Sequence, residues 1–127
     1  MVEISKAIFE KNGRYLLLQR ASHSQSYPDL WDFPGGKHEP GETSQQSVIR
    51  EVKEETSFDI EPGEEIKLAA YKDDKHDLLF HYFIPSSVSG ELKLSPDHSD
   101  YKWVEIKELN GLTRHPSVVL FFAKMQH

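Results

Sequence analysis

The sequence predicts a single α+β domain spanning residues 1–127, and three observations support this fold class. With 127 residues, 37% of them hydrophobic, the chain is long enough to bury one core and too short for two ordinary domains. Short segments of strand character and two segments of helical character follow one another closely, without internal repeats or linkers. Their order lacks the regular strand–helix alternation of a doubly wound sheet, which favours the α+β class.

The N-terminal part of the chain predicts a β-hairpin followed by a loop. Residues 4–10 and 14–20 predict two strands, because the intervening Asn12-Gly13 is a strong hairpin signal. Residues 21–29, with three serines and a proline, predict a loop. Residues 30–33 form a short apolar segment that we expect to stop at Pro34.

The pattern becomes helical from residue 43 to about residue 56. Val48 and Val52 lie four residues apart among charged neighbours. Thr43 followed by Gln46 predicts a capping box, and Glu42 lies where a negative charge stabilises the positive end of the helix dipole. The sequence therefore predicts an amphipathic helix with a defined N-cap.

The rest of the chain predicts five more strands and a final helix. We expect these strands at residues 58–60, 65–72, 77–84, 91–94 and 101–106. The final helix is expected to begin near Pro116, because proline suits the first turn of a helix.

Composition excludes several classes of function. The chain has no cysteine, which excludes disulfide scaffolds, thiolate nucleophiles and metal centres with cysteine ligands. Its net charge of −6 argues against binding to long nucleic acids, and no apolar stretch approaches the roughly 20 residues that cross a bilayer. No signal peptide is apparent at the N-terminus, so we expect a cytoplasmic protein without a membrane partner. The seven histidines show no HxxH or HExxH spacing, and we expect them on the surface or in loops with no required role.

Three glutamates of the predicted helix are candidate metal ligands. Glu51, Glu54 and Glu55 stand at i, i+3 and i+4, which places three carboxylates on one helix face. Magnesium prefers oxygen ligands and commonly takes one or two carboxylates together with substrate phosphates. A metal and phosphate platform beside a glycine-rich loop is one interpretation, and a well-solvated acidic helix is the other.

The spacing around these glutamates resembles the signature of the Nudix hydrolases, G-x5-E-x7-R-E-U-x-E-E-x-G-U. Gly36, Glu42 and the run from Arg50 to Glu55 occupy its specified positions, and Val52 and Phe58 fill the two apolar positions. The resemblance implies a Nudix-type α/β/α sandwich with a mixed β-sheet and a loop–helix–loop motif. Less specifically, it extends over the whole domain.

One position departs from the signature. Ser57 stands where the family has glycine, directly after the predicted helix. A serine can adopt the left-handed conformation usual at this point at a cost of about 1 kcal/mol. We therefore expect a slightly less stable helix end and an intact site.

The resemblance also implies roles for individual residues. The implied metal ligands are the carboxylates of Glu51, Glu54 and Glu55, the backbone carbonyl of Gly35, and Asp100 or its neighbour Asp97 from a loop. The implied catalytic set is Glu51, Glu54 and Arg50, with Glu51 as the first choice of general base. Arg50 is expected to pair with Glu42 and so hold the glutamates in register. A polar turn is the alternative for the two aspartates.

The stretch from Trp31 to Lys37, WDFPGGK, resembles the W-E-F-P-G-G-K stretch of MutT-like nucleoside triphosphate pyrophosphohydrolases. The implied substrate-binding residues are Arg20, Phe33, Gly36 and Lys37. Arg20 lies where relatives place a phosphate-binding arginine, and a plain surface arginine is the alternative. Phe33 either stacks on a base or belongs to the core.

The resemblance implies hydrolysis of a nucleoside diphosphate linked to another moiety, with Mg²⁺ or alternatively Mn²⁺. We expect the substrate to be a (deoxy)nucleoside triphosphate, cleaved to a monophosphate and pyrophosphate. Hydrolysis of ADP-ribose, of another nucleotide sugar or of a dinucleotide stays open, as does a nucleotide-binding sensor without catalysis. The expected partner is a small-molecule nucleotide, and the resemblance leaves a homodimer open.

Overall fold

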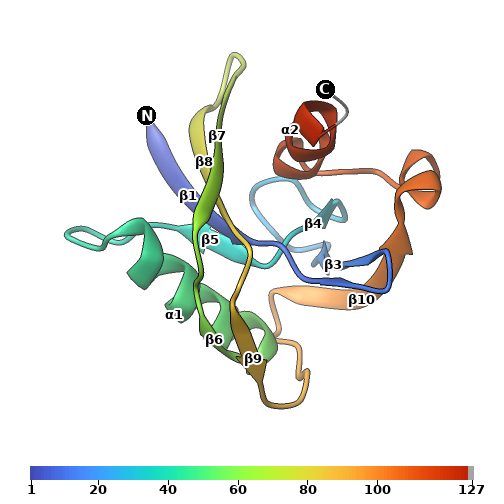
Figure 1. Cartoon of the computed structure of the whole chain (residues 1–127). Helices are drawn as coiled ribbons and strands as arrows, with labels where there is room; N and C mark the ends of the chain where they lie inside the picture. The colour runs from blue at the N-terminus through green and yellow to red at the C-terminus, as the bar shows by residue number, and fades with distance from the viewer. Residues whose placement is uncertain (126–127) are drawn as a thin grey trace.

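The computed structural model describes residues 1–125, apart from the side chain of Lys67. Within them the chain forms ten strands, two α-helices and one 3-10 helix (Figure 1). In chain order these are β1 (Val2–Ala7), β2 (Glu10–Lys11), β3 (Arg14–Arg20), β4 (Trp31–Asp32), β5 (Gly35–Lys37), α1 (Ser44–Thr56), β6 (Asp59–Glu61), β7 (Glu65–Lys72), β8 (Asp77–Phe83), β9 (Ser87–Ser89), β10 (His98–Glu105), η1 (Ile106–Gly111) and α2 (Pro116–Met125). The predicted α+β class is confirmed.

Two sheets and a short ribbon make up the β-structure. The first sheet has the strand order β5-β1-β8-β7 and is mixed, because β1 runs parallel to β8 and antiparallel to β5. The second has the order β10-β3-β2, with β4 also paired to β3, and is antiparallel. Strands β6 and β9 form the ribbon. Helix α1 packs on β1 and β5, and α2 lies on the other side against β7 and β4 (Figure 1).

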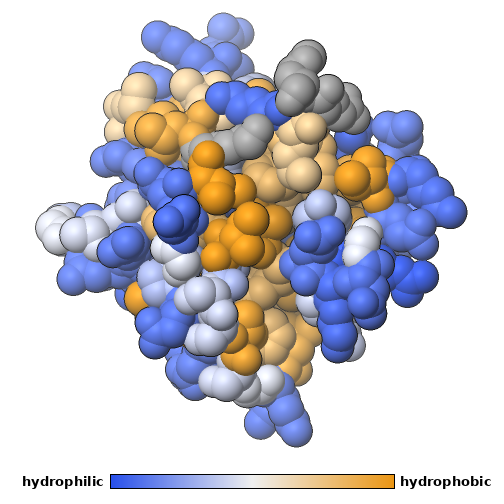
Figure 2. Space-filling model, in the orientation of Figure 1, coloured by the Kyte–Doolittle hydropathy of each residue, from blue (hydrophilic) through white to orange (hydrophobic). Residues whose placement is uncertain are grey.

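Each helix covers its own hydrophobic core. Val48 and Val52 of α1 pack with Leu16 and Leu18 of β3 in one cluster. The other cluster is rich in aromatic rings, for example Phe33 of the segment after β4, Tyr82 of β8 and Phe121 of α2. Figure 2 shows a strip of hydrophobic residues down the middle of the face seen in Figure 1, with hydrophilic residues on both sides. No helix among residues 1–125 is long and apolar enough to span a membrane.

Several predicted elements are confirmed. Strands β3 and β7 have the predicted limits, and α2 begins at Pro116. Helix α1 carries the predicted capping box, in which the Thr43 hydroxyl accepts from the Gln46 N–H and the Gln46 side chain accepts from the Thr43 N–H. Ser57 adopts the predicted left-handed conformation, with φ 70°.

The strand predicted at residues 4–10 is wrong as one element, because it is divided between the two sheets. Residues 2–7 form β1 in the first sheet, whereas only Glu10 and Lys11 pair with β3. In the crossing between them, Ala7 N–H donates to the Pro34 carbonyl and Ile8 N–H to the Phe83 carbonyl. The predicted turn itself is present, with positive φ at Asn12 and Gly13.

The strand predicted at residues 91–94 is also wrong. The strand in this region is β9 at residues 87–89, and residues 91–94 have no regular structure. Leu92 and Leu94 alternate with polar residues for another reason: both are half-buried and pack on the hydrophobic cluster that contains Val48 and Val52 of α1. Lys93 N–H donates to the Thr56 carbonyl, which fixes this segment to the end of α1. The 3-10 helix η1 was not predicted, and neither was β5.

Candidate active site

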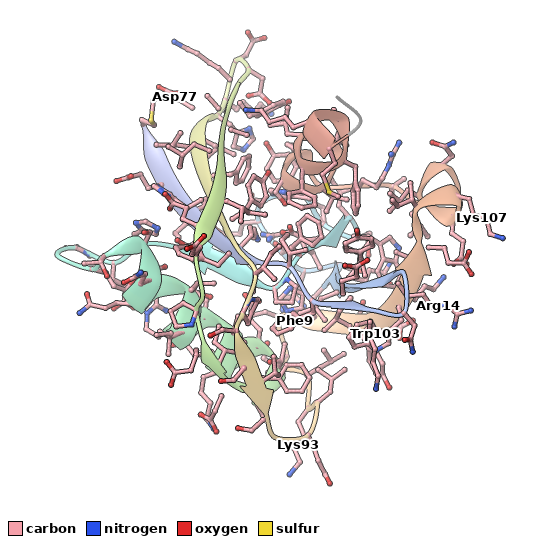
Figure 3. All side chains as sticks on the ribbon, in the orientation of Figure 1. Phe9, Arg14, Asp77, Lys93, Trp103 and Lys107 are labelled. Carbon is pink, nitrogen blue, oxygen red and sulfur yellow. The ribbon has the colours of Figure 1, made fainter. Side chains whose placement is uncertain are left out.

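A cleft of about 680 Å³ brings together residues from both sheets, α1 and three connecting segments. Its floor includes Glu51 and Glu55 of α1 and the backbone of Gly35 and Gly36. The loop of residues 23–27, the β7–β8 turn and residues 97–98 form further walls. Asp77, on one wall, lies beside the start of β1 (Figure 3), with its carboxylate 3.9 Å from the amino group of Met1.

A second hollow of about 610 Å³ lies at the β2–β3 turn. Arg14 and Trp103 (Figure 3) line it together with Glu105. It contains none of the carboxylates of α1, so the cleft above the helix is the candidate site.

The glycine pair brings the backbone close to the two carboxylates. Gly35 has φ 140°, and a Cβ atom there would collide with the Ser5 carbonyl, so only glycine fits. Its N–H donates to Glu55 Oε1 at 2.9 Å. At Gly36 a Cβ atom would lie 2.6 Å from the Glu51 carboxyl carbon. The absence of side chains at both positions therefore makes room for Glu51 and Glu55 at the cleft floor.

Arg50 fixes the α1 carboxylates, and the expected contact with Glu42 is present. Its Nε donates to Glu42 Oε2 at 2.6 Å and its Nη2 to Glu42 Oε1 at 3.0 Å. Nη1 donates to Glu51 Oε1 at 2.8 Å, and Nη2 also to the Lys37 carbonyl at 3.1 Å. The hydrogen bonds from Arg50 lower the pKa of Glu42 to about 2. Arg50 therefore ties the motif loop to the helix.

Glu55 is the buried member of the pair. Burial raises its pKa well above the ordinary value, opposed by the Lys6 charge and by the Gly35 N–H. The negative charges of Glu51 and Asp32 raise it further. A positive charge at the cleft floor would relieve this burial of negative charge.

A charged network that was not predicted from the sequence lies beneath the cleft. Lys6 Nζ donates to Asp32 Oδ2 at 2.9 Å, and Arg20 Nη1 donates to the same oxygen at 3.3 Å. The Ser117 hydroxyl donates to Asp32 Oδ1 at 2.8 Å. Burial disfavours the Asp32 anion, yet the neighbouring His115, Lys6 and Arg20 hold its pKa well below the usual range. A signal existed, since Lys6 stands between apolar Ile4 and Ile8 at the two-residue period of an inward strand face.

The expectation of surface or loop positions is wrong for His98, which is buried at the start of β10, whereas His115 lies in a loop, as expected, but is buried there. His98 and His115 are buried, both line the cleft, and burial lowers the pKa of each to about 4. His115 Nδ1 accepts from the Ser117 N–H at 3.1 Å, so its proton lies on Nε2. The Tyr27 ring packs edge-on against His115 and also meets His76, where the β7–β8 turn closes the cleft. The sequence around His98 and His115 gave no sign that these two histidines would be buried beside the cleft.

The structure brings only some of the predicted site residues to the cleft. The residues that line it are Arg20, Gly35, Gly36, Lys37, Glu51, Glu55 and Asp97. Glu54 does not line the cleft, because it points to solvent with 58% of its side chain exposed and pairs with Arg50 at 3.3 Å. Asp100 is also outside, exposed in β10, where its carboxylate accepts the Tyr101 N–H.

The position of Phe33 decides between the two interpretations of this residue, stacking on a base or packing in the core. It is fully buried and packs against Phe121 and Tyr82, so its ring presents no surface to the cleft. The expectation that Phe33 binds substrate is therefore wrong. Packing by α2, which lies more than 80 residues further along the chain, decides this placement.

The donor atoms at the floor fit a hard divalent cation. Among residues 1–125 no three His, Cys, Asp or Glu side chains are grouped to hold a metal by themselves. Glu51 and Glu55 offer carboxylate oxygens at the cleft floor, and Mg²⁺ commonly uses one or two carboxylates together with substrate phosphates and water. The buried carboxylate of Glu55 lies near that of Glu51, and a cation bound between them would reduce the repulsion of their negative charges.

Comparison with known proteins gives consistent matches. A family model described as NUDIX domain matches residues 2–122. The chain is 42% identical to the CTP pyrophosphohydrolase of Escherichia coli K12 over 64 residues, about half of either protein. It is 27% identical to the nucleoside triphosphatase NudI of Enterobacter sp. strain 638 over 128 residues, covering 92% of this chain and 91% of the relative.

Solved structures agree with these sequence matches. The MutT protein of Methanosarcina mazei Go1 aligns with a TM-score of 0.84 and 29% identity, covering 98% of this chain and 91% of the other. The solution structure of the E. coli ORF135 protein aligns with a TM-score of 0.81 and 29% identity, covering 99% and 89%.

Proposed function

Because the chain belongs to the NUDIX domain family, we propose that it hydrolyses a nucleoside triphosphate to a monophosphate and pyrophosphate, with Mg²⁺ or alternatively Mn²⁺. One observation carries the proposal. Glu51 and Glu55, one helix turn apart, lie on the floor of a cleft whose walls also carry basic side chains. Carboxylates for a cation and cations for a polyphosphate therefore share one cavity.

The basic side chains come from separate parts of the fold. Lys6, Arg20, Lys37 and Lys75 all line the cleft, although the whole chain has a net charge of −6. Local positive charge of this kind attracts a short polyphosphate more than a long nucleic acid, which needs an extended basic surface. The cleft therefore favours a small nucleotide.

Arg50 and Glu51 set up the proton transfer in this proposal. A divalent cation, when bound, supplies charge neutralisation for the pyrophosphate and acidifies the attacking water. Among the hydrogen bonds of residues 1–125, Arg50 engages only Oε1 of Glu51. Oε2 therefore stays available to accept the proton of the water, and the Arg50 contact keeps the carboxylate oriented.

The names of the relatives support a triphosphate substrate. One is called a CTP pyrophosphohydrolase and another a nucleoside triphosphatase. Hydrolysis of ADP-ribose or of a dinucleotide, and nucleotide binding without turnover, are alternative outcomes of the test. A cytoplasmic location and a homodimer stay predictions.

The test is a screen for phosphate release with and without added pyrophosphatase. We expect Mg²⁺-dependent signal on at least one nucleoside triphosphate only when pyrophosphatase is present. Glu55→Gln is expected to lower turnover by about 100- to 1,000-fold, because an electrostatic contribution at the reacting phosphate is lost. The matched control is Glu64→Gln, since Glu64 is exposed and lies outside the cleft.

Three results would contradict the proposal. Direct release of orthophosphate would assign a different bond, and normal turnover by Glu55→Gln would remove the proposed site. Binding of nucleotides without turnover of any triphosphate, ADP-ribose or dinucleoside polyphosphate would favour the sensor.

A further inference from the structure

A buried lysine lies at the floor of the cleft. Lys6 is 2% exposed, yet it lines the cavity together with Glu51 and Glu55. Its ammonium group donates to Asp32 Oδ2 at 2.9 Å, and to the carbonyl oxygens of Phe33 and Gly35 at 3.3 Å each. The three N–H groups of the ammonium thus meet three acceptors, which holds the charge in one place.

The same glycine joins this lysine to the α1 carboxylate. In the pairing of β1 with β5, Lys6 stands opposite Gly35. The N–H of Gly35 donates to Glu55, and its carbonyl accepts from Lys6. Lys6 and Glu55 therefore contact the two successive peptide groups that flank the Cα atom of Gly35, Lys6 at the carbonyl oxygen and Glu55 at the N–H.

This position conflicts with a metal ion at the same carbonyl. A magnesium ion bound to the Gly35 oxygen would lie about 2.1 Å from it, and hence at most about 5.4 Å from the ammonium nitrogen, which is 3.3 Å from that oxygen. Two cations so close repel each other strongly in a buried site. Asp32 does not cancel this repulsion alone, because Arg20 shares its carboxylate with Lys6.

We propose that Lys6 is a resident cation of the active site, which takes the position beside the Gly35 carbonyl that a divalent cation would otherwise occupy. The inference rests on the metal site of the proposed function. It confines a divalent cation in the nucleotide-free protein to the side of Glu51 and Glu55 facing the open cleft. Lys6 acts as a positioning residue that limits where and how tightly the metal binds before the nucleotide arrives.

The experiment is a titration of nucleotide-free protein with Mn²⁺, followed by the electron paramagnetic resonance signal of free Mn²⁺. Lys6→Met keeps the length of the side chain and removes the charge, and we expect at least tenfold tighter binding of Mn²⁺. Lys6→Arg keeps the charge, and we expect the wild-type dissociation constant within about twofold. The matched control is Lys53→Met, which removes an exposed lysine that pairs with Asp59 outside the cleft.

The outcomes separate this inference from the proposed function. Equal Mn²⁺ affinity in wild type and Lys6→Met, or no Mn²⁺ binding by either, overturns the role of Lys6. Equal tightening in Lys53→Met also overturns it, since net charge would then explain the effect. Absence of triphosphate hydrolysis with the expected Mn²⁺ titrations would instead refute the substrate assignment.

A second variant covers the case in which Lys6→Met does not fold. Removing the lysine leaves buried Asp32 with fewer partners, which is costly. In Lys6→Met/Asp32→Asn both members of the pair lose their charge. Tighter Mn²⁺ binding by this double variant than by Asp32→Asn alone supports the inference, and equal binding overturns it.

Discussion

Replacing Gly36 by alanine tests the position of the Glu51 carboxylate without disturbing the backbone. The new Cβ atom would lie 2.6 Å from Cδ and Oε2 of Glu51, whereas ordinary carbon contacts are about 3.5 Å or longer. The carboxylate must therefore move by about 1 Å. A displacement of this size at a reacting group costs about 100-fold in rate, equivalent to about 2.7 kcal/mol of activation free energy.

The stability of Gly36→Ala is expected to stay within about 1 kcal/mol of wild type. Gly36 has no positive φ, and the atoms that must shift are the end of a flexible side chain. The measurements are kcat and KM for the preferred triphosphate together with the denaturant midpoint. Gly111→Ala is the control, since a Cβ atom there meets nothing within 4 Å. Full activity in Gly36→Ala would refute the role of Glu51, and loss of folding would refute the argument that only the side chain moves.

Two further predictions concern stability. Ser57→Gly is expected to raise the free energy of unfolding by up to about 1 kcal/mol with unchanged kcat, because serine is held at φ 70°; an unchanged or lower urea midpoint contradicts this. The second concerns His115, whose pKa burial lowers to about 4, so that below about pH 6.5 the unfolded chain takes up a proton that the folded protein excludes. The charged and titratable groups that face His115 are Tyr27, His76, Asp32, Lys6 and Arg20. The folded protein therefore loses stability as the pH falls from 6.5 towards 4. Between pH 7 and pH 5, we expect the loss in the free energy of unfolding to be about 2 kcal/mol smaller in His115→Gln than in the wild type, as measured by urea denaturation. Parallel pH profiles of the two proteins would contradict this.

The parts of the site that depend on local spacing could be predicted from the sequence. The capping box needs only Thr43 and Gln46, three residues apart, and a helix forms it without help from the rest of the fold. The contact between Arg50 and Glu42 follows similarly, because the motif loop is short and returns directly to the helix. Ser57 was predictable for the same reason, since the end of a helix fixes its conformation.

The parts that depend on tertiary register could not be predicted. Lys6 and Asp32 are separated by 26 residues and lie in strands of two different sheets, β1 and β4, so only the packing of the whole fold brings them together. The motif treats Glu54 and Glu55 alike, whereas packing of α1 on β1 and β5 buries Glu55 and leaves Glu54 in solvent. An i, i+3, i+4 pattern defines a broad helix face, and only the packed neighbours decide which edge of it meets the cleft.

The bond from Ser117 to Asp32 has a consequence for synthesis of the protein. Eighty-five residues separate the two, and the hydroxyl comes from the first turn of the last helix. The backbone carbonyl of Ser117 is in turn fixed by the Tyr82 hydroxyl at 2.6 Å. A nascent chain that has not yet reached residue 117 therefore holds Asp32 without one of its partners, although nearly all of the β-structure has already been translated. The set of partners around Asp32 is thus completed only after α2 has been synthesised and has docked.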